Sequence, residues 1–155
     1  MKIDNAYIVA DIGGTNSRFG LVTGYSDSTY QITNQQKYPS IQFSGIEQAT
    51  QHYIDSLNGQ EFSGACLAVA GPIAGDKVNL TNLNWHFSTA KVKHDLALES
   101  LEIINDFAAY AYAAPLVREE NLMILNNGNG LTDCPVAVVG PGTGFGVASL
   151  VPFKD

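Results

Sequence analysis

The chain has 155 residues, of which 45% are hydrophobic and 15% charged, a composition typical of a globular protein and not of a disordered one. Its net charge is -7 with only eight lysines and arginines, which disfavours nucleic acid and anionic membranes as partners because both require a basic face. Two isolated cysteines do not predict a metal site or a disulfide framework, and no apolar run has the length of a signal peptide or a membrane span, so we expect a cytoplasmic protein.

The segment 7–38 predicts three consecutive strands. Short apolar runs at 7–10 and 19–22 flank the turn 11–16, a pattern that is typical of a β-hairpin. The stretch 29–38 is more polar and is interpreted as a third strand. Strands that follow one another so closely favour an antiparallel meander.

The next part predicts a helix followed by a buried strand. Ser44 and Glu47 have the spacing of a capping box. Apolar residues then recur with a helical period over 46–57, and Gly59 is expected to end this helix. The run 64–70 is almost entirely apolar, as expected of a strand that is covered on both faces.

The pattern continues with two further helices and one strand. The stretch 71–85 is rich in Gly, Pro and Asn and predicts a long loop or an excursion hairpin. Ser88 is expected to cap a helix that runs to about Leu98. A short strand at 101–104 and a helix at 107–114 follow. The order β-β-β-α-β-α-β-α predicts an α/β fold of the ribonuclease-H-like (actin-like ATPase) class, with three antiparallel strands and then alternating helices and parallel strands.

The last part of the chain repeats the pattern of its first part. A possible strand at 122–125 precedes two apolar strands at 136–139 and 147–151, which flank a glycine-rich turn. We therefore expect a second domain of the same class to begin here. The expected division is a small domain at 1–117, a connector at 118–134 and the first hairpin of an incomplete second domain at 135–155.

The turn from Asp11 to Asn16 is the first candidate for chemistry. Gly13 and Gly14 let backbone N–H groups approach an anion without an obstructing Cβ, and Thr15 and Asn16 add side-chain donors. Asp11 could hold a hydrated Mg²⁺ beside bound phosphates. An ordinary hairpin turn explains the same residues about equally well when they are taken alone. The sequence has neither a Walker A lysine nor a Rossmann fingerprint.

The second candidate for chemistry is the pair Asn105 and Asp106 at the end of a predicted strand. A carboxylate at the carboxyl end of a strand is well placed to accept the proton of a hydroxyl that attacks a phosphate. Asp106 is the candidate base and Asn105 a hydrogen-bonding neighbour for a polar substrate. A helix N-cap alone would also account for this aspartate.

Two weaker motifs complete the candidates. Gly142, Thr143 and Gly144 offer a second set of backbone donors for phosphate. Asn82 and Trp85 could line a sugar site, although turn-forming asparagine and a tryptophan in the core account for them at least as well.

Taken in order, these segments resemble bacterial glucokinases of the actin, Hsp70 and sugar-kinase superfamily. The segment Ile103-Ile104-Asn105-Asp106-Phe107 carries the resemblance most specifically. The other matching segments are 10–16, 70–73, 81–85 and 140–146.

The resemblance implies a two-domain enzyme that phosphorylates glucose at the 6-hydroxyl with ATP and Mg²⁺. Asp106 would be the catalytic base, Asn105 and Asn82 would bind the sugar, and Asp11 would hold Mg²⁺ through water. The residues implied in phosphate binding are Ala10, Asp11, Ile12, Gly13, Gly14, Thr15, Asn16, Gly142, Thr143 and Gly144. We expect a homodimer with glucose and MgATP as ligands.

The family completes its sugar site with residues that lie beyond position 155, so the resemblance implies that the chain ends before the enzyme is complete and that it is inactive alone. We also expect the hairpin near the end of the chain to associate through its apolar edge. Three alternatives stay open at this point: a kinase for another hexose, a sugar-responsive repressor without activity, and an actin- or Hsp70-like ATPase.

Overall fold

A computed structural model of the chain describes residues 6–26, 29–131, 133–141 and 145–153. The chain divides into two compact units, residues 1–106 and 107–155. Among the described residues, no helix has the length and apolar character that crossing a membrane requires.

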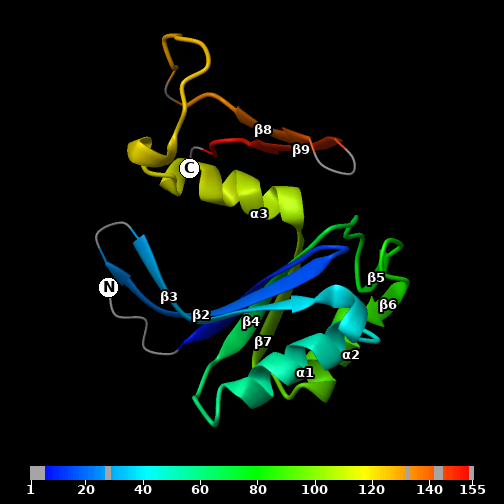
Figure 1. The fold of residues 1–155 in the computed structure, drawn as a ribbon. Helices are drawn as coiled ribbons and strands as arrows, with labels where there is room; N and C mark the ends of the chain where they lie inside the picture. The colour runs from blue at the N-terminus through cyan, green and yellow to red at the C-terminus, as the bar shows by residue number, and fades with distance from the viewer. Residues whose placement is uncertain (1–5, 27–28, 132, 142–144, 154–155) are drawn as a thin grey trace. The chain divides into compact units, whose positions relative to one another are not determined.

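A five-stranded mixed sheet forms the centre of the first unit (Figure 1). The strand order is β3-β2-β1-β4-β7, in which β1–β2 and β2–β3 are antiparallel and β1–β4 and β4–β7 are parallel. This topology confirms the fold class predicted from the sequence. The strands are β1 (Tyr7–Ile12), β2 (Asn16–Ser26), β3 (Thr29–Pro39), β4 (Gly64–Val69) and β7 (Ser100–Asn105).

The hydrophobic core lies between one face of this sheet and the helices α1 (Ile46–Ser56) and α2 (Thr89–Asp95) (Figure 1). Alternate residues of each strand point to the same face, so β1 and β4 each bury a row of apolar side chains there. Tyr53 of α1 and Val92 of α2 are fully buried against them. The rows in the two strands are Ile8, Ala10, Ile12, Ala65, Leu67 and Val69.

The start of α1 differs from the prediction. Gly45 is the N-cap and no side chain caps the helix, so the capping box between Ser44 and Glu47 is wrong. The backbone N–H and hydroxyl of Ser44 instead donate to Oε1 of Gln48, over 2.7 and 3.1 Å. Because the helix begins one residue later than expected, Gln48 occupies the third helical position and reaches back past the cap.

Between β4 and α2, the chain forms the hairpin that was one of the two predicted alternatives. It consists of β5 (Lys77–Leu80) and β6 (Trp85–Ser88). Ser88 caps α2 as predicted, because its hydroxyl accepts a hydrogen bond from the N–H of Lys91 over 3.1 Å.

The helix α2 ends at Asp95 and not near Leu98, because the chain turns into a Schellman motif. The N–H of Leu98 donates to the carbonyl of Lys93, and that of Ala97 donates to the carbonyl of His94. Ala97 has φ 50°, the left-handed conformation that glycine adopts with much less strain.

Ala97→Gly is therefore expected to raise the free energy of unfolding by about 1 kcal/mol. Ala90→Gly is the matched control, since Ala90 is exposed in the same helix without a positive φ. It is expected to lower stability, by about 0.5 kcal/mol. Chemical denaturation of both variants measures these changes, and a loss of stability in Ala97→Gly would contradict the strain argument.

The second unit contains α3 and a two-stranded sheet. The helix α3 (Asp106–Ala113) agrees with the predicted helix, and the antiparallel strands β8 (Val136–Pro141) and β9 (Phe145–Leu150) agree with the predicted hairpin. The strand expected at 122–125 is wrong, because these residues form no strand and follow the short 3-10 turns η2 (Ala114–Leu116) and η3 (Glu119–Asn121). Their apolar side chains are exposed, and without a pairing partner a short apolar run does not form a strand.

Candidate functional site

Three chain segments meet where the parallel strands of the sheet end. Ile12 of β1 lies in register with Val69 of β4, and Val69 lies in register with Asn105 of β7. The carboxyl ends of the three strands therefore reach the same edge, where open α/β folds bind their ligands. This register brings the turn after β1, the loop after β4 and Asp106, all of which belong to the first unit, to the same edge.

The turn after β1 is held tightly to its neighbours. The N–H of Gly13 donates to the carbonyl of Asn16 over 2.9 Å, and the N–H of Ala70 donates to the carbonyl of Ile12 over 3.1 Å. Neither Gly13 nor Gly14 adopts the left-handed conformation. The backbone angles thus do not require glycine at either position, and the absence of Cβ atoms leaves the turn open to an approaching ligand.

The tip of the β5–β6 hairpin lies beside this turn. A Cβ added at Gly14 would come within 3.4 Å of the Cβ of Asn82. Asn82 is exposed, whereas Trp85 is almost fully buried in the core. The structure therefore brings Asn82 to the candidate site but supports the core interpretation of Trp85.

Asp11 is paired with a cation. Its carboxylate accepts a hydrogen bond from Arg18 over 2.8 Å, across the antiparallel pair that the two residues form in β1 and β2. Both side chains are about half exposed, so this ion pair contributes at most about 1 kcal/mol to stability. Among the described residues, no group of three or more acidic, histidine or cysteine side chains is arranged to hold a metal. Mg²⁺ usually keeps several waters and takes its remaining ligands from phosphate, so one protein carboxylate is enough for it. The Asp11 carboxylate would have to share this role with its bond to Arg18.

The other candidate carboxylate is fixed by its neighbour. The Nδ2 of Asn105 donates to Oδ1 of Asp106 over 2.9 Å and to the carbonyl of Gly71 over 3.0 Å. Asp106 is partly buried and is the first residue of α3, where the helix dipole stabilises a negative charge. The carboxylate is therefore held at the strand edge and is not enclosed in hydrocarbon.

The remaining predicted positions contribute few side-chain groups to the candidate site. The side chains of Ala10 and Ile12 are buried in the core, so only their backbone groups could reach a ligand. Thr15 is exposed at the turn. The predicted positions Gly142, Thr143 and Gly144 lie outside the described residues.

Sequence analysis missed two buried serines under the turn. Ser17 and Ser40 are both fully buried, and their hydroxyl oxygens lie 2.9 Å apart. One signal was available: Ser17 alternates with Phe19 and Leu21 of β2, so it occupies an inward position of that strand. A polar residue at such a position needs a partner, and the partner could not be identified without the fold.

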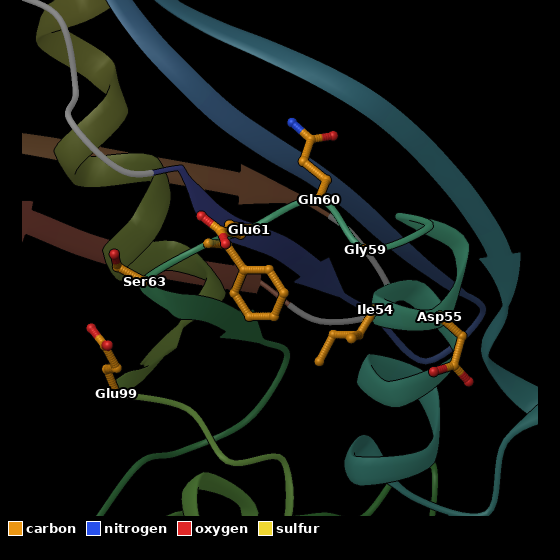
Figure 2. Close-up of a pocket in the computed structure, with 8 residues that line it drawn as sticks. Ile54, Asp55, Gly59, Gln60, Glu61, Ser63 and Glu99 are labelled. Carbon is orange, nitrogen blue, oxygen red and sulfur yellow. The ribbon is translucent and has the colours of Figure 1, made fainter.

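A hollow lies at the opposite edge of the sheet from the candidate site, at the amino ends of the parallel strands (Figure 2). It has a volume of about 570 Å³. Three carboxylate side chains line it, those of Asp55, Glu61 and Glu99. Their charge disfavours a phosphate there, so the carboxyl edge remains the candidate site.

Comparison with known proteins gives a consistent result. The glucokinase family model matches residues 8–155. The chain is 44% identical to a glucokinase from Saccharophagus degradans over 149 residues, which are 96% of this chain and 46% of that protein. The chain thus spans about half the length of this curated relative.

Solved structures show the same similarity. A crystal structure of glucokinase from an Antarctic psychrotroph superposes with a TM-score of 0.86 at 44% identity, covering 95% of this chain and 46% of that one. A glucokinase of the ROK family from Streptomyces griseus, solved with glucose and AMPPNP, superposes with a TM-score of 0.59 at 19% identity, covering 94% of this chain and 44% of that one. The second similarity shows the fold alone.

Proposed function

Because this chain belongs to the glucokinase family, we propose that it supplies part of the active site of an ATP-dependent glucose kinase. The reaction transfers the γ-phosphoryl group of ATP to the 6-hydroxyl of glucose and gives glucose 6-phosphate and ADP. The observation that carries the proposal is the meeting of a glycine turn and a held carboxylate at one edge of the sheet. Phosphoryl transfer to an alcohol requires both an anion site and a base.

Asp106 accepts the proton of the 6-hydroxyl as its oxygen attacks the γ-phosphorus. The hydrogen bond from Asn105 orients this carboxylate, and Asn105 and Asn82 contribute to binding the sugar. General base catalysis of this kind contributes about 10²–10⁴-fold to the rate. The base therefore has the largest expected effect of any single side chain in the described part of the site.

The turn after β1 binds phosphate oxygens through backbone N–H groups, together with Gly142, Thr143 and Gly144. Asp11 fits a hydrated Mg²⁺, whose charge would neutralise the phosphates when it is bound. The Streptomyces griseus protein of the same fold was solved with AMPPNP, an ATP analogue, which is consistent with ATP as the phosphate donor.

The test is a coupled assay of the full-length protein with a panel of sugars. We expect phosphorylation of glucose and little or no turnover of fructose or N-acetylated hexoses. Turnover of another hexose in preference to glucose would correct the substrate. Hydrolysis of ATP without any sugar would contradict the proposal and favour an actin- or Hsp70-like ATPase.

Further predictions on domain division, location and assembly accompany the proposed activity. We propose that 1–117 belongs to a small domain, 118–134 is a connector and 135–155 opens a second domain. The absence of strands and α-helices from the described residues of 118–134 supports the connector.

We also propose that the protein is cytoplasmic, since ATP is held in the cytoplasm, that it is a homodimer and that it feeds glycolysis. Light scattering of the full-length protein tests the dimer.

A further inference from the structure

The buried serine Ser40 contacts the candidate phosphate turn at two points. It follows β3 and begins the short 3-10 turn η1 (Ser40–Gln42). Its hydroxyl donates to the carbonyl of Gly13 over 2.8 Å, and its backbone N–H donates to the carbonyl of Thr15 over 2.9 Å. One residue therefore holds two carbonyl groups of the turn.

The direction of the hydrogen bonds follows from the number of protons. A serine hydroxyl has a single proton, and that of Ser40 is used for Gly13. The bond of 2.9 Å between the two serine hydroxyls must then be donated by Ser17. The result is a buried chain of hydrogen bonds from Ser17 through Ser40 to Gly13.

Because peptide groups are planar, fixing the carbonyls of Gly13 and Thr15 also fixes the direction of the N–H groups that follow them. In a trans peptide, the N–H of one residue points opposite to the carbonyl of the residue before it, and the described residues contain no cis peptide. Because the carbonyls of Gly13 and Thr15 face Ser40, the N–H groups of Gly14 and Asn16 point away from it. N–H groups that are oriented in this way can donate to an anion bound on the side of the turn that faces away from Ser40.

We propose that Ser40 is a positioning residue for the phosphate of the nucleotide. It touches no substrate, and it acts by fixing the two carbonyls whose peptides aim N–H groups at the ligand. The inference rests on the proposed function, since it presumes that the turn binds phosphate. Its specific content is that loss of the Ser40 hydroxyl weakens nucleotide binding more than it weakens sugar binding.

A purely structural role would give a different result, and Ser17 offers the matched control. Ser17→Ala and Ser40→Ala both remove the hydrogen bond between the two hydroxyls and both leave a small buried void. Only Ser40→Ala also removes the bond to Gly13. Ser40→Ala should thus lose somewhat more stability than Ser17→Ala. A purely structural role would leave the nucleotide affinity of both folded variants unchanged, whereas the proposal predicts a loss of affinity in Ser40→Ala alone.

The experiment titrates wild-type full-length protein, Ser17→Ala and Ser40→Ala with Mg-AMPPNP by calorimetry and measures KM for ATP and for glucose. Ser40→Ala is expected to weaken AMPPNP binding and raise KM for ATP by about tenfold, because small displacements of a binding group are costly. KM for glucose should stay within about twofold, as should all three values for Ser17→Ala. Ser40→Cys retains a weak donor and is expected to lie between wild type and Ser40→Ala. It also serves as the readout if Ser40→Ala does not fold.

Equal nucleotide affinity in the Ser17 and Ser40 variants, with AMPPNP binding intact in the wild type, would overturn the inference and leave the proposed function standing. Equal increases in both KM values for Ser40→Ala would also overturn it. No binding of AMPPNP by the wild type would overturn the proposed function and the inference together.

Discussion

Asp106→Asn in the full-length protein is expected to lower kcat for glucose phosphorylation by roughly a thousandfold, the midrange effect of losing a general base. The carboxamide can still accept the hydrogen bond that Asn105 donates, so the local structure is retained. It cannot take up the proton of the sugar hydroxyl. Affinity for MgATP is expected to be unchanged, because no nucleotide contact is assigned to this residue.

Glu102→Gln provides the control for charge. Glu102 is an exposed carboxylate on the same strand, β7, and it is not part of the site. Its neutralisation is expected to leave kcat within about twofold, because exposed charges outside a site have small effects. Steady-state kinetics and an AMPPNP titration of both variants give the comparison. A kcat of Asp106→Asn near the wild-type value would exclude Asp106 as the base.

The sheet could be predicted because its signals are local. Each central strand is a short apolar run between turn-forming residues, and 64–70 is almost entirely apolar because nearly every residue of β4, on both faces, is buried. The α3 helix follows from an Ala- and Tyr-rich run that ends before Pro115. The local pattern failed at 122–125, because a short apolar run is found both in strands and in segments without regular structure. In this protein the run has no strand partner and forms no strand.

The residue types of the site were also predictable, but not their partners. Asp106 and the glycine turn stand out in the sequence because they follow strand ends. The bond from Asn105 to Gly71 joins positions that are 34 residues apart, and the bond from Ser40 to Gly13 joins positions 27 apart. Helical and strand periods relate residues within one element and do not link positions so far apart in the chain. Only the topology of the sheet brings such residues into hydrogen-bonding distance.

Tyr53→Ala is expected to have the largest effect on stability. Tyr53 is fully buried, its ring stacks on Phe19 with centroids 5.0 Å apart, and its hydroxyl donates to the carbonyl of Asn34 over 3.1 Å. Truncation of a buried aromatic side chain to alanine costs about 3–5 kcal/mol. Tyr53→Phe keeps the ring and loses only the hydrogen bond, so it should cost about 1 kcal/mol. Equal losses in the two variants would show that packing of the ring contributes little.

The same tyrosine makes stability depend on alkaline pH. Burial, with a smaller contribution from Tyr38, raises the pKa of Tyr53 from 10.0 to about 12. The unfolded chain then releases the phenol proton at lower pH than the folded one, so the contribution of Tyr53 is complete below pH 10 and is lost as the pH rises towards 12. The stability difference between wild type and Tyr53→Phe isolates this residue, because the other ionising groups are present in both proteins. Urea unfolding across this range should show the difference shifting against the wild type above pH 10, and a difference independent of pH would contradict the burial of the phenol.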